Sequence, residues 1–469
     1  MNTFKQKSLY AALAGVSALG VTGAAQAVNV NPDGLGQVLI YPYYTVQNKV
    51  VGAAPFSSLL SVVNSTVSAK AVKVRFLEGR NSAEVLDFNL FLSAKDVWTA
   101  AVVQVGVGAG VGTFDKSCTV PTVGSTPTPF VNFAYAGDGA GDGLDRTREG
   151  YIEIIEMGVV TGTTAVGVTH KSGVPPCTAL DDATVQGNII APTGGLFGGL
   201  TMINVLAGED FTADAVALDN FRTSGKYDPP GGIKPDLRDV APATAVLFNG
   251  QAGVITSSGF AQNVDAVSAL FMHDHVYSEY VLDTGTKSGT DWVITSPTKR
   301  YYYDSKGVVQ YLFQKNFGAT GACDEIGLTV YDREEQTPTA PQGFSPPPPA
   351  GKKASLCWEA NVLTFNGTNV LGSANSLSAT VTYQNGWADL LYTQVVGDAG
   401  PAHELRSTST TRTALNGTTS TSAATYIGLP VIGFAVQSFD NGTIVSGTGQ
   451  FLQSKYGGNF VHKFTRKIN

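Results

Sequence analysis

The sequence predicts an all-β fold of tandem β-sandwich domains, immunoglobulin-like in type, with long Gly/Pro-rich loops and few short helices. Short runs of β-branched and aromatic residues recur along the chain and are separated by turn residues. Glycine accounts for 54 of the 469 residues, as a chain with many turns requires. Apolar residues make up 43% and charged residues only 14%, a composition that supplies a large core and does not match a disordered chain.

The first predicted sandwich begins with five apolar runs. The third of them alternates Val74 with Lys73 and Arg75, which predicts a half-buried strand with one solvent-facing side. The Asn-Ser-Thr turn at 64–66 predicts that the second and third runs pair as a hairpin. The five runs lie at 38–44, 59–63, 71–77, 85–92 and 97–103.

Loops interrupt the first domain before it ends. Residues 106–149 are rich in Gly, Thr, Pro and Asp, after which we expect a strand at 151–157 and a short helix at 213–221. Four prolines within 224–242 predict a domain boundary. The expected domains are 28–242, a sandwich with loop insertions, and 243–469, a second sandwich.

The second domain repeats the pattern of strands and turns. Runs at 277–282 and 292–295 predict a hairpin, and the three tyrosines at 301–303 predict a strand with rings on both faces. A Pro-rich loop at 336–352 contains a polyproline segment that cannot join a sheet ladder. Further strands are expected at 326–331, 357–365, 378–383, 388–395, 431–439 and 449–453, and Asn-Gly hairpin turns at 366–367, 416–417 and 441–442.

The N-terminus, residues 1–27, has the features of a secretory signal peptide. Lys5 and Lys7 precede an uncharged stretch at 9–21, and the Ala-Gln-Ala at 25–27 is an A-x-A cleavage site. The stretch is short and interrupted by glycines, and no later run reaches 18 apolar residues. We therefore expect an exported protein of the cell surface or extracellular space, with the periplasm as the alternative, and no transmembrane helix.

The charge of the chain excludes one class of partner. The sequence has 37 acidic and 30 basic residues, a net charge of −7. No broad basic face is available for phosphate backbones, so nucleic acid is not an expected partner. Both signs are sparse, so repulsion between neighbouring molecules is weak, which favours a protein that packs against others.

Four cysteines fit an exported protein with two disulfides. Three pairings are open, and we favour Cys118 with Cys177 and Cys323 with Cys357, because each pair flanks a loop-like insertion. No C-x-x-C motif occurs, so the sequence has no signature of thioredoxin chemistry or haem attachment.

The clearest local signal for a ligand is the acidic, glycine-rich loop at 138–149. Counted as a twelve-residue calcium loop, it has acidic residues at positions 1, 5 and 12 and a glycine at position 6. Position 3 is Ala140, and Arg146 within the loop would oppose a cation. A solvated loop is therefore the favoured interpretation, with calcium as the alternative. The candidate calcium ligands are Asp138, Asp142, Asp145 and Glu149.

His273 and His275 are the only closely spaced histidines in the sequence. In an extended segment both imidazoles and Glu279 would share one face, where they could bind one metal ion. A helix at 264–271 would split the pair, and no third histidine is near in sequence. A surface turn is therefore the favoured interpretation.

No catalytic motif stands out. The sequence lacks G-x-S-x-G and the P-loop. Glu153 and Glu156 are three residues apart in a strand, which places them on opposite faces and argues against shared acid–base work. We expect no catalytic site and no cofactor other than the candidate calcium. Aromatic side chains on an exposed sheet face would instead bind glycans or partner subunits.

Three segments carry a family resemblance: KAVKVRFLEG at 70–79, TDWV at 290–293 with PTK at 297–299, and LCWEA at 356–360. Together they resemble a group of uncharacterised proteobacterial secreted proteins that are often described as cell-surface proteins. The resemblance implies a location in the Gram-negative envelope, including the outer membrane, or outside the cell. It brings no catalytic or binding residues.

These observations lead to one expected function and two alternatives. We expect an exported cell-surface structural or interaction protein (a surface-layer, adhesin or assembly subunit) that contacts other copies of itself or cell-envelope components. The first alternative is a secreted carbohydrate-binding protein or hydrolase, stabilised by calcium. The second, an outer-membrane barrel, is disfavoured because the apolar runs are short or continuous instead of alternating over about 10 residues.

Overall fold

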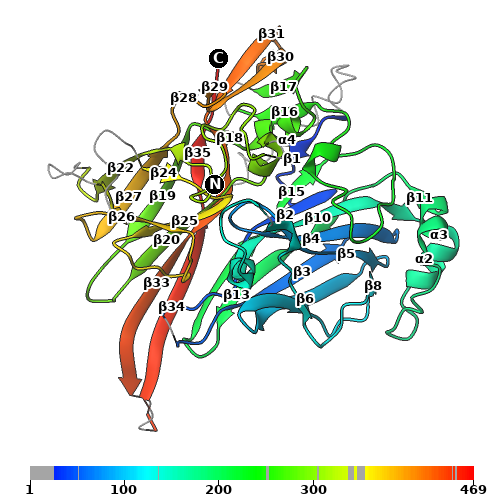
Figure 1. The fold of residues 1–469 in the computed structure, drawn as a ribbon, viewed down its shortest axis with the longest axis horizontal. Helices are drawn as coiled ribbons and strands as arrows, with labels where there is room; N and C mark the ends of the chain where they lie inside the picture. Colours follow the sequence, from blue (N-terminus) through cyan, green and yellow to red (C-terminus); the bar gives the residue numbers. More distant parts are fainter. Residues whose placement is uncertain are drawn as a thin grey trace.

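The computed structural model describes residues 26–469 apart from 51, 136, 250–252, 304–305, 336–342, 346–353, 446 and 449–450. Nearly all of the predicted signal peptide and most of the Pro-rich loop at 336–352 lie outside the described residues. The predicted all-β, sandwich-type fold is confirmed, because the structure is built from many antiparallel sheets with a few short helices (Figure 1). The immunoglobulin-like part of that prediction stays a prediction.

Two sheets form the sandwich of the first half. Sheet 1 has the order β1 (Asn29–Val30), β15 (Val216–Asp219), β2 (Val38–Thr45), β10 (Glu149–Val160), β4 (Lys70–Glu78), β5 (Glu84–Leu92) and β8 (Cys118–Val120), with β11 (Ile189–Ile190) on β10. Sheet 2 has the order β14 (Glu209–Asp214), β13 (Gly199–Asn204), β3 (Ser57–Asn64), β6 (Val97–Val105), β7 (Gly108–Gly112) and β9 (Thr128–Pro129), with β12 (Leu196–Phe197) on β3. Phe76 and Phe88 of sheet 1 and Trp98 of sheet 2 meet in the core between them.

Three larger sheets form the second half. Sheet 3 contains β22 (Gly327–Asp332), β27 (Asn385–Leu391), β19 (His275–Val281) and β35 (Lys463–Thr465). Sheet 4 contains β23 (Gly343–Ser345), β26 (Ser376–Thr380), β25 (Ala360–Phe365), β20 (Gly289–Thr295), β33 (Ile432–Val445) and β34 (Phe451–Val461). Sheet 5 contains β16 (Ala245–Phe248), β17 (Val254–Ser258), β30 (Glu404–Thr413), β31 (Thr419–Ile427) and β36 (Lys467–Ile468).

The remaining elements are short. Three two-stranded pairs join β18 (Met272–His273) to β32 (Leu429–Pro430), β21 (Asp324–Glu325) to β24 (Ser355–Leu356), and β28 (Val395–Gly397) to β29 (Gly400–Ala402). The helices are η2 (Phe133–Tyr135), η3 (Leu144–Arg148), α2 (Gly162–Val168), α3 (Asp182–Gly187), η4 (Leu237–Asp239), α4 (Val264–Phe271) and η6 (Lys299–Tyr302). Helix α4 lies at the residues where the sequence allowed a helix, and all of its residues are buried.

The two hairpins predicted from pairs of apolar runs, at 59–77 and 277–295, are both wrong for the same physical reason. The β3 strand pairs with β6 and β13 in sheet 2, whereas β4 pairs with β5 and β10 in sheet 1. In the same way β19 belongs to sheet 3 and β20 to sheet 4. Each connection crosses from one sheet to another, so the apolar sides of its two strands are buried from opposite sides of a core.

Three local predictions are also wrong. Residues 213–221 form the end of β14 and then β15 instead of a helix, because each strand pairs with a neighbouring strand. The three tyrosines at 301–303 lie in and after the 3₁₀ helix η6 instead of in a strand. The Asn-Gly at 441–442 lies inside β33, where the β33–β34 ladder shifts register, whereas the Asn-Gly at 416–417 joins β30 and β31 as predicted.

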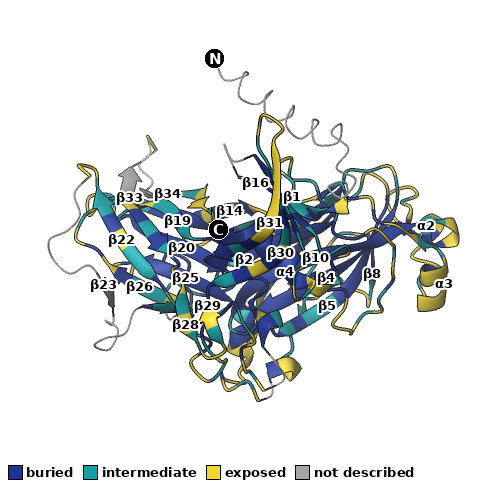
Figure 2. Cartoon of the chain, turned by 90° about the horizontal axis from the view of Figure 1, so that it is seen from above, coloured by how far each residue is buried: buried dark blue, intermediate teal, exposed yellow. Residues whose placement is uncertain are grey.

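The two halves of the chain share their hydrophobic cores. Val293, Val362 and Phe434 of sheet 4 belong to the cluster that fills the first sandwich. Val38 and Tyr151 of sheet 1 belong in turn to the main cluster of the second half. Sheets of both halves therefore pack as one body, and the division at residue 242 stays a prediction. Figure 2 shows buried strands through the middle of this body and exposed residues along α2, α3 and β31.

One long hairpin extends from the body. Strands β33 and β34 project beyond the other strands, as the orange and red arrows of Figure 1 show. Close to the body, β34 packs on β14, where the side chain of Asn459 donates to the carbonyl of Thr212 and Lys455 reaches Glu209. The hairpin therefore links sheet 4 to the edge of sheet 2.

Candidate functional site

The four predicted calcium ligands do not converge on one point. The carboxylate of Asp138 is bound by Arg146, whose two terminal nitrogens lie 3.0 and 2.8 Å from its two oxygens. The same guanidinium lies 2.9 Å from Glu78 and stacks on the Tyr135 ring. Arg146 therefore supplies the positive charge beside Asp138 that a calcium ion would supply in the alternative interpretation of this loop.

Glu149 is held elsewhere, at the start of β10. Its carboxylate accepts hydrogen bonds from the Tyr43 hydroxyl at 2.6 Å, the Ser373 hydroxyl at 2.6 Å and the Ala374 amide at 2.9 Å. Asp142 and Asp145 are exposed. Among the residues that the structure describes, no three acidic, histidine or cysteine side chains are grouped so that they could hold a metal ion.

The histidine pair is divided between two strands, so the predicted surface turn is wrong. His273 lies in β18, buried and stacked on Phe464 with 3.9 Å between ring centroids. Burial lowers the pKa of His273 well below its ordinary value. His275 begins β19 and its Nδ1 lies 2.8 Å from a carboxylate oxygen of Asp389.

The predicted disulfides are confirmed. Cys118 of β8 is bonded to Cys177, and Cys323 is bonded to Cys357. Two disulfides are typical of an oxidising, exported environment. Among the helices of the described residues, none is long and apolar enough to span a membrane.

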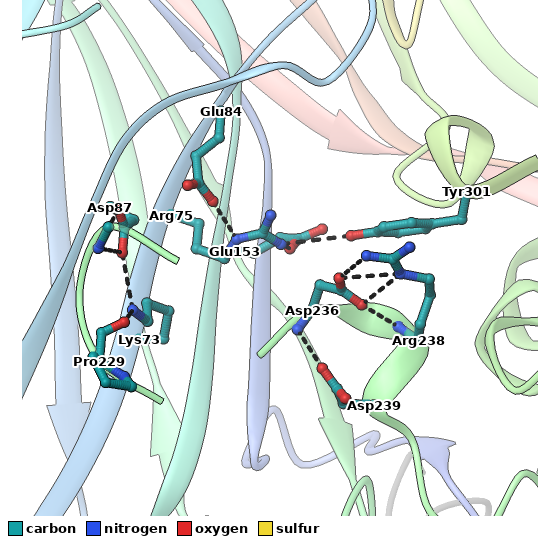
Figure 3. Close-up of polar contacts among 11 residues, drawn as sticks. Lys73, Arg75, Glu84, Asp87, Glu153, Pro229, Asp236, Arg238, Asp239 and Tyr301 are labelled. Atoms are coloured by element: carbon teal, nitrogen blue, oxygen red, sulfur yellow. Dashed lines mark hydrogen bonds and ion pairs between the residues drawn. The ribbon is translucent and has the colours of Figure 1, made fainter. Parts of the chain in front are cut away.

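A network of buried charges covers the side of sheet 1 that faces away from the sandwich core (Figure 3). Lys73 lies 2.9 Å from Asp87, and Arg75 lies 2.7 Å from both Glu84 and Glu153. The sequence predicted that Lys73 and Arg75 face solvent, which is wrong because every residue of β4 is buried. Each cation has an acidic partner, as burial of charge requires.

The segment 224–242, predicted as a domain boundary, covers this network. Its Pro229 carbonyl accepts from Lys73 at 2.8 Å, and its Gly231 amide donates to Asp87 at 2.9 Å. Arg238 of the same segment lies over the ring of Tyr301, whose hydroxyl is 3.5 Å from Arg75 (Figure 3). Residues from both halves of the chain therefore enclose the charges.

Burial beneath this segment changes the pKa of the Glu153 carboxyl group. Its Oε1 has no hydrogen-bond partner among the described residues. Burial raises the pKa of Glu153 to about 7, although the neighbouring Arg75 opposes the shift. Glu359, also buried, has its pKa raised to about 8 by burial. Such values are typical of functional carboxylates, but both residues are fully buried, so we assign them to the stability of the fold.

Sheet 3 carries a cluster of partly exposed aromatic rings, His275, Tyr277, Tyr331 and Trp387, which we call the aromatic face. Trp387 and Tyr331 are stacked with 4.2 Å between centroids, and Tyr277 lies 6.1 Å from Trp387 on the other side. His275 stacks with Tyr277 at 5.7 Å. The rings come from β19, β27 and β22, which are neighbours in the sheet, so they form one continuous row.

Sheet 2 carries a shallow groove of about 730 Å³ on its outer side, which we call the sheet 2 groove. Leu59, Phe114 and Phe197 line it together with small residues, and Asp214 is its only charged residue. Phe114 is 84% exposed and Leu59 is 44% exposed. The groove therefore presents apolar side chains to solvent on an almost uncharged surface.

Sequence reasoning missed the aromatic face. The sequence drew attention to the three tyrosines at 301–303 instead, of which Tyr302 and Tyr303 are buried. His275, Tyr277 and Glu279 occupy alternate residues of one strand and therefore share a face. This spacing could have predicted the part of the aromatic face that β19 carries. No family model, curated protein or solved structure matches this chain.

Proposed function

We propose that this chain is an exported interaction protein of the cell surface, and that copies of it associate through the sheet 2 groove. The observation that carries the proposal is the groove itself: exposed apolar side chains on the outer side of a sheet, with one charged residue among them. Exposed apolar surface of this kind marks interaction sites in soluble proteins.

The composition supports a second copy of the chain as the partner. The cores of interfaces between identical subunits are more apolar than ordinary protein surface and depleted of charge. The groove has that character, and the low charge of the whole chain keeps repulsion between copies weak. A groove on one copy that meets the same groove on another would bury Leu59, Phe114 and Phe197 together.

The disulfides support the exported location. Both are intramolecular and leave no free cysteine among the described residues. Such closed bridges suit a protein that works outside the reducing cytosol.

Two phenylalanines with matched exposure allow a direct test. Phe114 in the groove is 84% exposed and Phe133 in η2, outside the groove, is 83% exposed. We expect the protein from residue 28 onwards to show concentration-dependent self-association in sedimentation velocity. We expect Phe114→Ser to weaken it by about tenfold, which corresponds to 1.4 kcal/mol, and Phe133→Ser to leave it unchanged.

Fractionation of the native cells is a separate experiment and tests the location. We expect the protein at the cell surface. A protein that stays monomeric at high concentration and is absent from the surface fraction would contradict the proposal. Equal effects of the two serine substitutions would contradict the assignment of the groove.

A further inference from the structure

We infer that the aromatic face of sheet 3 is a binding site for a neutral polysaccharide. This inference goes beyond the proposed self-association, because it concerns a different sheet and a different class of ligand. It rests on the composition of the face: rings that can contact the apolar side of a sugar, interleaved with carboxylates and an imidazole that can bind its hydroxyls.

The rings supply the apolar part of the site. The Trp387 side chain is 38% exposed, and its neighbours Tyr277 and Tyr331 are partly exposed on either side of it. Figure 2 shows β22, which carries Tyr331, at the rim of the molecule with intermediate and exposed residues. Aromatic side chains that have an apolar ring and a solvent-exposed polar edge bind best to a partner that is itself amphipathic. A pyranose ring, with C–H groups on its faces and hydroxyls at its edge, is such a partner.

The polar groups lie in register with the rings. Asp389 is directly opposite Tyr277 across the β19–β27 pair, and Glu279 is directly opposite Trp387. Asp389 holds His275 through Nδ1 at 2.8 and 3.0 Å, so the orientation of the imidazole is fixed beside the rings. Binding sites for small polar ligands combine apolar walls with a few placed polar groups, as this face does.

The charges on this face select against anionic ligands. Glu279 and Asp389 lie on this face, and Asp274 lies beside His275, against Lys463, which is opposite Tyr277 in β35. An anionic polysaccharide would meet mostly negative charge, whereas a neutral one would accept and donate hydrogen bonds without repulsion.

The same charges disfavour a protein partner. Asp and Glu are depleted at the cores of protein interfaces, whereas here they alternate with the rings across neighbouring strands. The sheet 2 groove, with one charged residue, shows the opposite character. The two surfaces therefore suit two different partners.

Native affinity electrophoresis tests the site with the polysaccharide cast in the gel. The probes are dextran, laminarin and galactomannan as neutral polysaccharides, and alginate as the anionic comparison. We expect at least one neutral gel to retard the protein and alginate not to retard it. We expect Trp387→Ala and Tyr277→Ala to weaken binding at least about tenfold, and Trp387→Phe to retain most of it.

Two control variants separate this inference from the proposed function. Phe460 of β34 is 47% exposed and lies outside both surfaces, so Phe460→Ala should bind as the unmodified protein does. Phe114→Ser should weaken self-association and leave retardation in the polysaccharide gel unchanged. Trp387→Ala should weaken retardation and leave self-association unchanged. Circular dichroism of each variant shows whether it is folded.

The inference is overturned if no neutral gel retards the protein, if alginate retards it as strongly as the neutral polysaccharides, or if Trp387→Ala migrates as the unmodified protein does. None of these results affects the self-association test, because that test is read from sedimentation of the groove variants.

Discussion

Arg75 and Glu153 form an ion pair with 2.7 Å between Nη1 and Oε2, and both side chains are buried on the side of sheet 1 that faces away from the sandwich core. Arg75 also pairs with Glu84, so one cation serves two carboxylates. Because the enclosing segment 224–242 removes water from the pair, Glu153 retains a proton at pH values where an exposed glutamate would have lost it.

The first prediction concerns pH. The pKa of Glu153 is raised from an ordinary 4.5 to about 7, so the folded protein holds this proton more tightly than the unfolded chain. The contribution of Glu153 to the free energy of unfolding is therefore fully present below about pH 4.5 and is lost as the pH rises to about 7. We expect Glu153→Gln to remove up to about 3 kcal/mol of this pH dependence.

Urea denaturation between pH 4.5 and pH 8 measures the effect. Glu279→Gln, at an exposed glutamate of β19, serves as the control and should keep the slope of the unmodified protein. Part of the slope should persist in Glu153→Gln, because burial also raises the pKa of Glu359, to about 8. An unchanged slope in Glu153→Gln would show that Glu153 ionises normally in the folded state.

Strand β4 shows which features of the charge network could be predicted from the sequence. The alternation of Val74 with Lys73 and Arg75 predicted the strand and the opposite directions of the two kinds of side chain, and both are found. The burial of Lys73 and Arg75 could not be predicted, because the segment that covers them is about 150 residues away in sequence. The alternation of apolar and charged residues predicts to which face of the sheet a side chain points, but not whether another segment covers that face.

The candidate sites show the same limit. The loop at 138–149 has the acidic spacing of a calcium loop, but Glu78, which orients Arg146 against Asp138, comes from β4. The aromatic face needs Tyr331, Trp387 and His275 from three strands, so no local pattern contains it. The two disulfides could be predicted because each pair flanks one insertion in a contiguous stretch.

The second prediction concerns Arg146 and metal. Arg146→Met would leave the carboxylates of Glu78 and Asp138 without their shared cation. Loss of one partner from a buried ion pair costs about 3–5 kcal/mol, which thermal or urea unfolding would detect. Arg406→Met, which breaks a pair with Glu404 in which the arginine side chain is 71% exposed, should cost less than about 1 kcal/mol.

A chelator completes the second test. The guanidinium of Arg146 already binds the carboxylate of Asp138. We therefore expect the melting temperature of the unmodified protein to be the same with calcium and with EDTA. A rise in melting temperature with calcium, lost in Asp138→Asn, would restore the calcium interpretation of the loop.

The third prediction concerns the disulfides. The bonded cysteines are 59 residues apart in the first pair and 34 apart in the second. Loop closure of this size stabilises a folded chain by about 4 kcal/mol in the chain-entropy model. We expect Cys118→Ser with Cys177→Ser, and Cys323→Ser with Cys357→Ser, each to lower the free energy of unfolding by about that amount.

Dithiothreitol provides the control for the third prediction. In reducing urea titrations, the unmodified protein and both double variants should approach the same free energy of unfolding. A double variant that unfolds at the same urea concentration as the oxidised, unmodified protein would show that its bridge does not stabilise the fold.

The fourth prediction concerns a second buried cation, Lys299, which begins η6. Its Nζ lies 2.8 Å from Asp324 and 2.6 Å from the carbonyl of Ala322, and both charged side chains are almost fully buried. Asp324 also lies 3.2 Å from Nε2 of His403. Asp324→Asn would leave the Lys299 charge with a carbonyl but no counter-ion, at a cost of about 3–5 kcal/mol. We expect Lys299→Met to cost less, because Asp324 keeps His403 as a partner. In a double-mutant cycle of urea unfolding, Lys299→Met should therefore rescue part of the loss in Asp324→Asn, whereas additive effects would show that the two side chains do not interact.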